Sequence, residues 1–271
     1  MPELPEVETI RRGLAPLLAG RRFARAIVRH RGLRWPVARD FERQLEARAI
    51  ADVDRRGKYL LIRCDGGTLI VHLGMSGSLC VVPSSTPPGK HDHLDLALDD
   101  GRLLRFSDPR RFGSVHWVEH DPLEHPLLAA LGPEPLAPGF DGDRLYTGTR
   151  GRKAAIKQVL MDGHVLAGIG NIYASEALFR AGIHPSRGAG RVSRARYRVL
   201  AEAIHTTLEL ALAAGGSTLR DFVDANGAPG CFQQQYGVYG RAGEPCRRCG
   251  ATIRLLRQGQ RSTFYCPRCQ R

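Results

Sequence analysis

Lysine is scarce in this 271-residue sequence. Of its 40 basic residues only four are lysines, at Lys58, Lys90, Lys153 and Lys157, and all the others are arginines. Lysine carries a compact charge on a flexible stem, whereas arginine offers a planar fork of donors. We therefore take each lysine as a sign that a compact charge is preferred at that position.

Long apolar stretches are missing as well. No run of eighteen or more apolar residues occurs, so we expect no transmembrane helix. The N-terminal region is acidic and lacks the apolar segment of a secretory signal. These absences predict a cytoplasmic protein, either an enzyme or a binding protein.

Positive charge is in large excess, with a formal net charge of +13. An excess of this size predicts a polyanionic partner, and nucleic acid is the first candidate. Ribosomal proteins, or a plain requirement for solubility, give a similar excess. The length is sufficient for a real hydrophobic core and predicts two domains.

The first fourteen residues combine a helix signal with a candidate nucleophile. Apolar residues recur at helical spacing from Leu4 to Leu14 and predict a helix over residues 5–18. Removal of Met1 would leave the secondary amine of Pro2 beside the carboxylate of Glu3. Because an α-amino group titrates at about 7.7–8.0, this amine is partly unprotonated at neutral pH and is able to form a Schiff base. The alternative is that Pro2 and Glu3 only begin the helix, where proline and acids are favoured.

A block of short β segments follows, separated by turn signals such as Asp65-Gly66-Gly67. The predicted strands are Phe23–His30, Ala49–Asp54, Tyr59–Arg63, Thr68–Leu73, Ser78–Val82, His93–Leu98, Arg102–Phe106 and Ser114–Val118. Eight short strands in one block indicate an antiparallel sandwich or a flattened barrel. Residues 119–150 are rich in proline and glycine and are interpreted as the connection between domains.

Helices are predicted in the second half of the chain. One apolar face spans Ala155–Leu160, another spans Ala174–Leu178, and a long helix is predicted from Ser193 to Ala214. Ser193 is the expected N-cap of that helix. A shorter helix is predicted over Thr218–Val223.

The cysteines give the strongest local signal. Two C-x-x-C pairs, Cys246/Cys249 and Cys266/Cys269, are separated by sixteen residues, which is typical of a structural zinc site with four sulfur ligands. Disulfides are the alternative, but they are typical of secreted chains. Residues 241–271 carry eight arginines and one glutamate, so we expect this finger to lie against phosphates.

Two further motifs suggest contacts with nucleic acid. Gly168–Glu176 places glycines before a helix, where free backbone N–H groups bind phosphate, although such a turn is often only a turn. Met75 lies in a glycine-punctuated turn, and Arg110 and Phe112 lie on another tight loop. Apolar side chains of this kind can enter a base stack, but they are more often core residues.

These motifs together resemble the family of bacterial formamidopyrimidine-DNA glycosylases. The match extends in order from residue 2 to residue 270 and rests on Pro2–Thr9, Lys58–Leu60, His72–Gly77, Lys90–His93, Asp108–Gly113, Gly170–Glu176 and the terminal finger.

The resemblance implies an α+β fold. It consists of an N-terminal antiparallel β-sandwich with an N-terminal helix, a C-terminal helix–two-turn–helix domain and a four-cysteine zinc finger. The implied divisions are residues 1–132 for the sandwich, 133–150 for a linker, 151–225 for the helical domain, 226–240 for a lesion-recognition loop and 241–271 for the finger. A flexible linker is an equal alternative for the segment Gly227–Gly240.

The resemblance also implies a base-excision repair enzyme that removes 8-oxoguanine and formamidopyrimidines from duplex DNA and then cleaves the strand by β,δ-elimination. The implied catalytic residues are Pro2 as nucleophile, Glu3 as acid and base, and Lys58 and Arg261 near the phosphates. The implied DNA-binding residues are Glu6, Met75, His91, Arg110, Arg111, Phe112, Lys157 and Asn171.

The implied partner is damaged double-stranded DNA, and the protein is expected to be a monomer with one structural zinc ion and no catalytic cofactor. An endonuclease VIII-like glycosylase for oxidised pyrimidines is the nearest alternative, and Met75 and the Asp108–Gly113 loop argue against it. A zinc-finger protein without activity is the other. It would be favoured if Pro2, Glu3 or Lys58 were absent.

Overall fold

The computed structural model describes residues 2–217 and 230–271. The chain forms two compact units, unit 1 from Met1–Ala129 and Ala214–Cys231 and unit 2 from Ala130–Ala213 and Phe232–Arg271. Among the described residues, no helix has the length and apolar character needed to cross a membrane.

Unit 1 begins with the helix α1 (Leu4–Leu18), which confirms the predicted N-terminal helix. Pro5 lies in its first turn, where the missing backbone N–H costs nothing. The apolar side chains of Val7, Ile10 and Leu14 are at most 1% exposed. The helix therefore belongs to the interior of unit 1.

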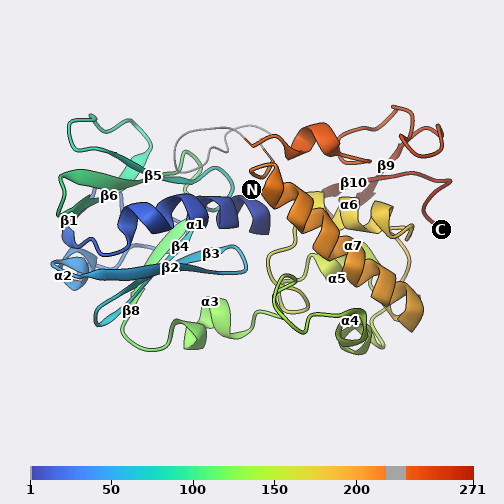
Figure 1. Ribbon diagram of the computed structural model, residues 1–271, viewed down its shortest axis with the longest axis horizontal. Helices are drawn as coiled ribbons and strands as arrows, with labels where there is room; N and C mark the ends of the chain where they lie inside the picture. The colour runs from blue at the N-terminus through green and yellow to red at the C-terminus, as the bar shows by residue number, and fades with distance from the viewer. Residues whose placement is uncertain (1, 218–229) are drawn as a thin grey trace. The chain divides into compact units, whose positions relative to one another are not determined.

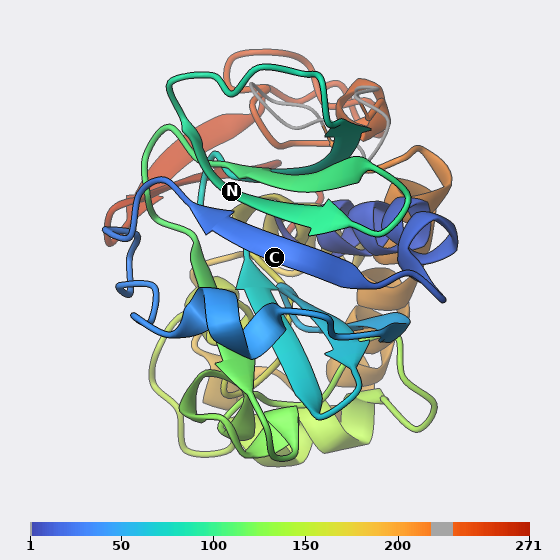
Figure 2. The same ribbon diagram turned by 90° about the vertical axis from the view of Figure 1, so that its left-hand side faces the viewer.

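All eight predicted strands are present in unit 1, within a few residues of their predicted bounds. They are β1 (Phe23–Val28), β2 (Ile50–Arg56), β3 (Tyr59–Cys64), β4 (Gly67–His72), β5 (Ser78–Pro83), β6 (Asp92–Leu98), β7 (Arg102–Ser107) and β8 (Ser114–Val118). They form two four-stranded antiparallel sheets, in the orders β1-β6-β7-β5 and β2-β3-β4-β8 (Figures 1 and 2). This confirms the sandwich and excludes the flattened barrel.

One hydrophobic core joins α1 to both sheets. Val7 and Leu14 of α1 belong to the same buried cluster as Phe23, Leu60 and Phe106. The short helix α2 (Phe41–Leu45) adds two more buried side chains to this cluster. The sequence did not reveal α2, because five residues are too few to show a helical period. The short elements η1 (Pro122–Glu124) and α3 (Pro126–Ala129) end this part of the chain.

Unit 2 is helical with a terminal hairpin. Its elements are α4 (Gly142–Thr149), α5 (Ile156–Leu160), α6 (Asn171–Arg180), η2 (Ala189–Arg191), α7 (Arg194–Ala213), η3 (Phe232–Gln235), β9 (Arg254–Gln258) and β10 (Arg261–Tyr265). The predicted helices are confirmed, and Ser193 caps α7 by accepting a hydrogen bond from the Arg196 N–H at 3.4 Å. The predicted helix over Thr218–Val223 lies outside the described residues.

The segment interpreted as the connection between domains, residues 119–150, contains three helical elements, η1, α3 and α4. Asp141 caps α4 by accepting a hydrogen bond from the Arg144 N–H at 2.8 Å. At Gly142 the backbone approaches α7 so closely that a Cβ atom would lie 2.3 Å from the Cα of Arg198. The surrounding prolines and glycines concealed a helix that is packed inside unit 2.

A buried ion-pair network crosses the sheet β1-β6-β7-β5. Asp95 is fully buried on β6, and its Oδ1 accepts a hydrogen bond from Nε of Arg105 at 2.8 Å. Its Oδ2 accepts another from Nη2 of Arg29 at 2.6 Å. Burial raises the pKa of Asp95, but the hydrogen bonds from the two arginines lower it by more, so the pKa lies below its ordinary value.

We predict that Asp95→Asn lowers the free energy of unfolding by about 1–3 kcal/mol at pH 7, because Arg105 loses its closest carboxylate and keeps only Asp92, whose Oδ2 lies 3.4 Å from Nη1. The folded pKa of Asp95 is depressed, so its contribution is complete above the unfolded pKa of about 3.9 and is lost as the pH falls below that value. The difference between wild type and variant, measured by urea unfolding, should therefore shrink below about pH 4. A difference that stays constant down to pH 3 would contradict this assignment.

Candidate functional site

The N-terminal end of α1 is enclosed within unit 1. Pro2 is buried, and Glu3 and Glu6 are 3% and 2% exposed. Glu3 is the N-cap of the helix, and its backbone N–H donates to Oε2 of Glu6 at 2.8 Å. The other oxygen of Glu6 accepts from the Ser217 N–H at 2.8 Å. Glu6 therefore fixes the backbone of the residue next to Pro2.

Lys58 lies in the turn between β2 and β3, next to Gly57, whose φ is +59°. This left-handed conformation favours glycine. The half-buried lysine lies near His72, a residue that the sequence did not single out. Burial, followed by the charges of Lys58 and Arg34, lowers the pKa of His72 to about 4. Its Nδ1 accepts a hydrogen bond from the Gly74 N–H at 3.1 Å, so the neutral ring carries its proton on Nε2.

The structure brings together the two loops that carry Met75, Arg110 and Phe112. At Gly74, φ is +64° and a Cβ atom would lie 2.4 Å from the backbone N of Gly113, so the two backbones touch. Phe112 is 44% exposed, and the Arg110 guanidinium carbon lies 4.7 Å from the centre of its ring. Met75 is half-buried. The exposed phenyl ring does not support the alternative that Phe112 is a core residue.

Asp108 holds these loops in place, and the sequence did not identify this role. Its side chain is fully buried. Oδ1 accepts hydrogen bonds from the Ser76 hydroxyl at 2.8 Å and from the Arg110 N–H at 3.2 Å, and Oδ2 accepts from the Gly113 N–H at 2.8 Å. One carboxylate therefore connects the turn that bears Met75 to the loop that bears Arg110.

A basic cavity of about 450 Å³ lies beside this loop in unit 1. Its lining includes Arg29, His30, Lys90, His91 and Arg111. Nη1 of Arg111 lies 3.0 Å from Nε2 of His30. The predicted DNA-contacting residues His91 and Arg111 therefore lie in one positively charged hollow, to which His30 and Arg29 also belong.

In unit 2, the start of α6 adjoins the finger hairpin. Nδ2 of Asn171 donates to the Ser262 carbonyl at 3.1 Å, and Ser262 follows the exposed Arg261. The predicted phosphate contacts Asn171 and Arg261 are thus close together. Lys157 differs from its prediction as a DNA contact, because it is 1% exposed and its Nζ donates to the Thr263 hydroxyl at 2.7 Å. Its charge supports β10 from the interior.

Glu176 anchors the segment that follows η3, and the sequence gave no signal for this contact. The carboxylate accepts hydrogen bonds from the backbone N–H groups of Gly237, Val238 and Tyr239 at 2.8–3.0 Å. Burial raises the pKa of Glu176 in spite of these three donors. Phe232 and Tyr236 are also buried, so residues 232–239 are packed and do not form a flexible linker. Residues 227–229 lie outside the described part of the chain.

The four predicted zinc ligands converge in unit 2. The Sγ atoms of Cys246, Cys249, Cys266 and Cys269 all lie within 4.8 Å of one another. A tetrahedral site with Zn–S bonds of about 2.3 Å requires sulfur atoms about 3.8 Å apart, and the Cys246–Cys269 pair is separated by 3.9 Å. Backbone N–H groups of Arg248 and Cys269 point to Sγ of Cys246 and Cys266 at 3.4 Å, which is the support that thiolate ligands need. The residues fit one structural zinc ion.

Three family models match consecutive parts of the chain. The formamidopyrimidine-DNA glycosylase N-terminal domain matches residues 1–115, and the H2TH domain of the same glycosylase matches residues 131–223. A zinc finger found in FPG and IleRS matches residues 243–271. The finger with four cysteines therefore matches a zinc finger, and its sulfur pairs Cys246–Cys269 and Cys249–Cys266, 3.9 and 3.5 Å apart, are not joined as disulfides.

Known proteins give the same result over the full length. The formamidopyrimidine-DNA glycosylase of Alkalilimnicola ehrlichii is 58% identical, with all of both chains covered. The crystal structure of the MutM (Fpg) protein of Thermus thermophilus has a TM-score of 0.89 and 40% identity, covering 99% of this chain and 98% of that one. A Lactococcus lactis FPG (MutM) in complex with DNA containing Fapy-dG has a TM-score of 0.90 and 33% identity, covering 99% and 100%. This chain belongs to the formamidopyrimidine-DNA glycosylase family.

Proposed function

We propose that this chain excises oxidised purines, namely 8-oxoguanine and formamidopyrimidines, from duplex DNA and then cleaves the strand at the resulting abasic site. The observation that carries the proposal is the enclosed N-terminal end of α1, where Pro2 precedes a carboxylate that is 3% exposed. Family membership supports it, as does the Lactococcus lactis relative in complex with Fapy-dG DNA.

The chemistry begins at the amine of Pro2 once Met1 has been removed. The amine attacks C1′ of the damaged nucleotide, the C1′–N bond to the base breaks, and the base leaves with a proton. Glu3 is the group placed to move protons in this step. The C1′–O4′ bond then breaks, O4′ takes up a proton, and the opened sugar is held to Pro2 as an iminium ion. The iminium makes the 2′ protons of the sugar acidic, so that elimination breaks the 3′ and then the 5′ C–O bond to phosphate. Glu6 holds the Glu3 backbone during these steps.

The nucleotide must leave the base stack before its sugar carbon can be attacked, at a cost of about a few kcal/mol. We assign Met75, Arg110 and Phe112 to the space that the extruded base leaves behind. Arg110 is stacked on Phe112 and faces the orphaned cytosine, whose O2 and N3 atoms accept hydrogen bonds. The shared anchor at Asp108 keeps the three side chains in one group.

The phosphate contacts are assigned to polar and charged side chains of each unit. In unit 1 they are Lys58, His91 and Arg111, and in unit 2 they are Asn171 and Arg261. Lys157 acts through β10, since its ammonium group binds the Ser262 carbonyl and the Thr263 hydroxyl at 3.1 and 2.7 Å. The excess of positive charge supports a DNA partner in general.

The domain limits proposed from the sequence need one revision. We place the sandwich at residues 1–132, the loop at 226–240 and the finger at 241–271, and we extend the helical domain from 151–225 to 142–225 so that it includes α4. A monomer acting on chromosomal DNA in the bacterial cytoplasm, at the nucleoid, agrees with this assignment. The second candidate, an endonuclease VIII-like activity, is disfavoured by Met75 and the Asp108–Gly113 loop.

We predict that borohydride traps the protein covalently on a duplex that carries 8-oxoguanine opposite cytosine, because borohydride reduces the imine. Pro2→Gly should abolish or sharply reduce this adduct, as measured by gel shift under denaturing conditions. Mass spectrometry of the wild type should show that Met1 is absent. Failure of the wild type to trap or nick the duplex would refute the enzyme assignment, and trapping on oxidised thymine alone would move the chain to the endonuclease VIII branch.

The role of Arg110 predicts a change in opposite-base preference. Arg110→Ala should reduce excision of 8-oxoguanine opposite cytosine, and the preference for cytosine over adenine should fall by about 1–3 kcal/mol, the worth of one good base contact. The control is cleavage of a preformed abasic site, which needs no base extrusion and should change less. An unchanged ratio of rates opposite cytosine and adenine would remove Arg110 from this role.

We predict that removal of the zinc ion weakens DNA binding and leaves the chemistry at Pro2 in place. Cys249→Ser should lower the zinc content, measured by atomic emission, from one ion per chain to near zero, since a structural site needs all four ligands. The affinity for duplex DNA should fall by at least about tenfold because Arg261 lies on the finger hairpin. Full affinity in a zinc-free protein would show that the finger makes no contribution to binding.

A further inference from the structure

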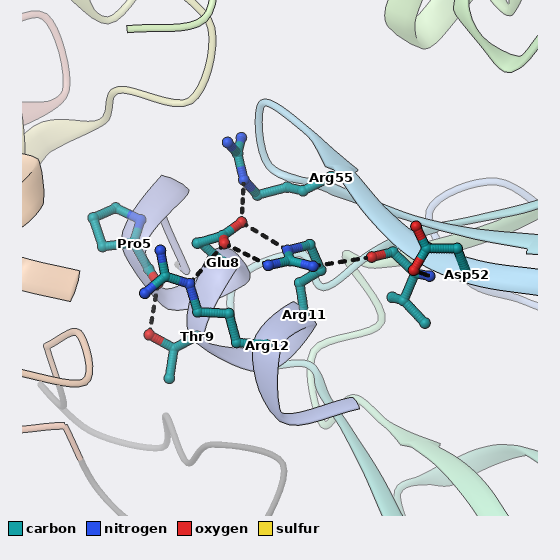
Figure 3. Close-up of polar contacts among 8 residues, drawn as sticks. Pro5, Glu8, Thr9, Arg11, Arg12, Asp52 and Arg55 are labelled. Atoms are coloured by element: carbon teal, nitrogen blue, oxygen red, sulfur yellow. Dashed lines mark hydrogen bonds and ion pairs between the residues drawn. The ribbon is translucent and has the colours of Figure 1, made fainter. Parts of the chain in front are cut away.

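Glu8 occupies an unusual position in unit 1, because one carboxylate binds three arginines. It lies on α1, and Figure 3 shows the guanidinium groups of Arg11, Arg12 and Arg55 gathered around it. Nε and Nη2 of Arg11 donate to Oε2 and Oε1 at 3.0 and 2.9 Å, and Nε of Arg12 donates to Oε1 at 2.9 Å. Nε of Arg55 donates to Oε2 at 3.1 Å.

The charge of Glu8 is essential to this cluster. The side chains of Glu8 and Arg55 are only 11% and 10% exposed, so little water competes for their contact. Burial raises the pKa of Glu8, but the hydrogen bonds from Arg11 and Arg12 and the charges around them lower it by more, and the pKa lies below its ordinary value. Glu8 is therefore ionised throughout the neutral range, and each arginine has a charged acceptor.

Arg55 transmits the position of Glu8 to the turn between β2 and β3. Its Nη1 donates to the carbonyl of Gly57 at 2.9 Å, while its Nε binds Glu8. Gly57 directly precedes Lys58. A single planar guanidinium thus joins the helix that begins beside Pro2 to the turn that carries Lys58.

A second connection reinforces the first. Nη1 of Arg11 donates to the Val53 carbonyl on β2 at 3.3 Å. Glu8 therefore binds one arginine of α1 that contacts β2 and another, Arg55, that belongs to β2. Arg12 is different. Its side chain is 58% exposed, and its recorded partner is Glu8 alone among the described residues.

We propose that Glu8 is a positioning residue that sets the place of Lys58 relative to the Pro2 amine through Arg55 and the Gly57 carbonyl. This rests on the proposed function, in which Pro2 attacks the sugar and Lys58 meets the adjacent phosphates. Glu8 itself touches no reacting atom. Its effect on the rate follows from geometry, since a displacement of about 1 Å in such a group reduces a rate by about 10²-fold.

The test is a double-mutant cycle that joins Glu8→Gln with Lys58→Ala. Glu8→Gln keeps the size of the side chain and removes its charge. We expect kcat for excision of 8-oxoguanine to fall about 10- to 100-fold in Glu8→Gln with little change in KM. In the Lys58→Ala background the same substitution should cost less than about twofold, because the group that it positions is gone.

Two variants serve as controls. Arg12→Gln removes a donor to Glu8 without touching the bridge, and its activity should stay within about twofold of wild type, as expected of an exposed ion pair. Arg55→Lys keeps a positive charge next to Glu8 but lacks the fork that also reaches Gly57. It should reproduce the loss of kcat and the same lack of additivity with Lys58→Ala, and it replaces Glu8→Gln if that variant fails to fold.

The outcomes separate this inference from the proposed function. The positioning role is overturned if the fold-losses in kcat of Glu8→Gln and Lys58→Ala multiply in the double mutant. It is also overturned if both Glu8→Gln and Arg55→Lys keep the wild-type kcat. Neither outcome contradicts the chemistry assigned to Pro2. Wild-type kcat in Lys58→Ala overturns both the role of Lys58 and its positioning by Glu8. Failure of the wild type to form the borohydride adduct refutes the proposed function itself.

Discussion

The pairing of Glu6 with two backbone N–H groups, those of Glu3 and Ser217, is the constraint on which the N-terminal site depends. A chain terminus is normally the least ordered part of a domain. Here it is the start of a helix whose apolar face enters the core of unit 1, and whose first turn is tied down by a buried carboxylate. A reactive amine at a terminus needs this kind of restraint, because an unrestrained one would spend little time at the geometry of attack.

Carboxylates recur as the anchors of other parts of the molecule. Asp108 joins the loop of Met75 to the loop of Arg110 and Phe112. Glu176 accepts hydrogen bonds from three backbone N–H groups, and Glu8 accepts them from three arginines. In this arginine-rich chain these acids do more than balance the positive charge. Each satisfies several hydrogen-bond donors, most of them in the interior, and so each holds a loop or turn in place.

Much of the fold was predictable from sequence, because local signals and long-range packing agree there. The strands of unit 1 are short apolar runs bounded by turn residues, and the two C-x-x-C pairs have the spacing that is typical of a four-sulfur zinc site. α2 and α4 were not predictable, the first because it is too short and the second because prolines and glycines surround it. The prediction that Lys157 contacts DNA failed for a related reason. A lysine in a basic chain suggests a surface contact, and only the contact of its Nζ with Thr263 on β10 shows that its charge is buried.

The site was less predictable than the fold. Motifs identified residues whose type is unusual for their place, such as Pro2, Met75 and Phe112. The motifs include Asp108, Glu176, Glu8 and His72 but gave none of them a role, because the role of a buried acid or histidine depends on its partners in the fold, and some of these partners are far away in sequence. The link from Glu8 to Arg55, for example, spans 47 positions.

The close backbone approach of Gly74 to Gly113 has a consequence for protein engineering. A Cβ atom at Gly74 would meet backbone atoms of the opposite loop, which cannot yield as a flexible side chain would. The two glycines and Asp108 together fix the backbone of both loops, whereas the side chains of Met75, Arg110 and Phe112 can be exchanged without changing that backbone. A mutant library meant to alter the opposite-base preference should therefore randomise these three side chains and keep the two glycines and Asp108.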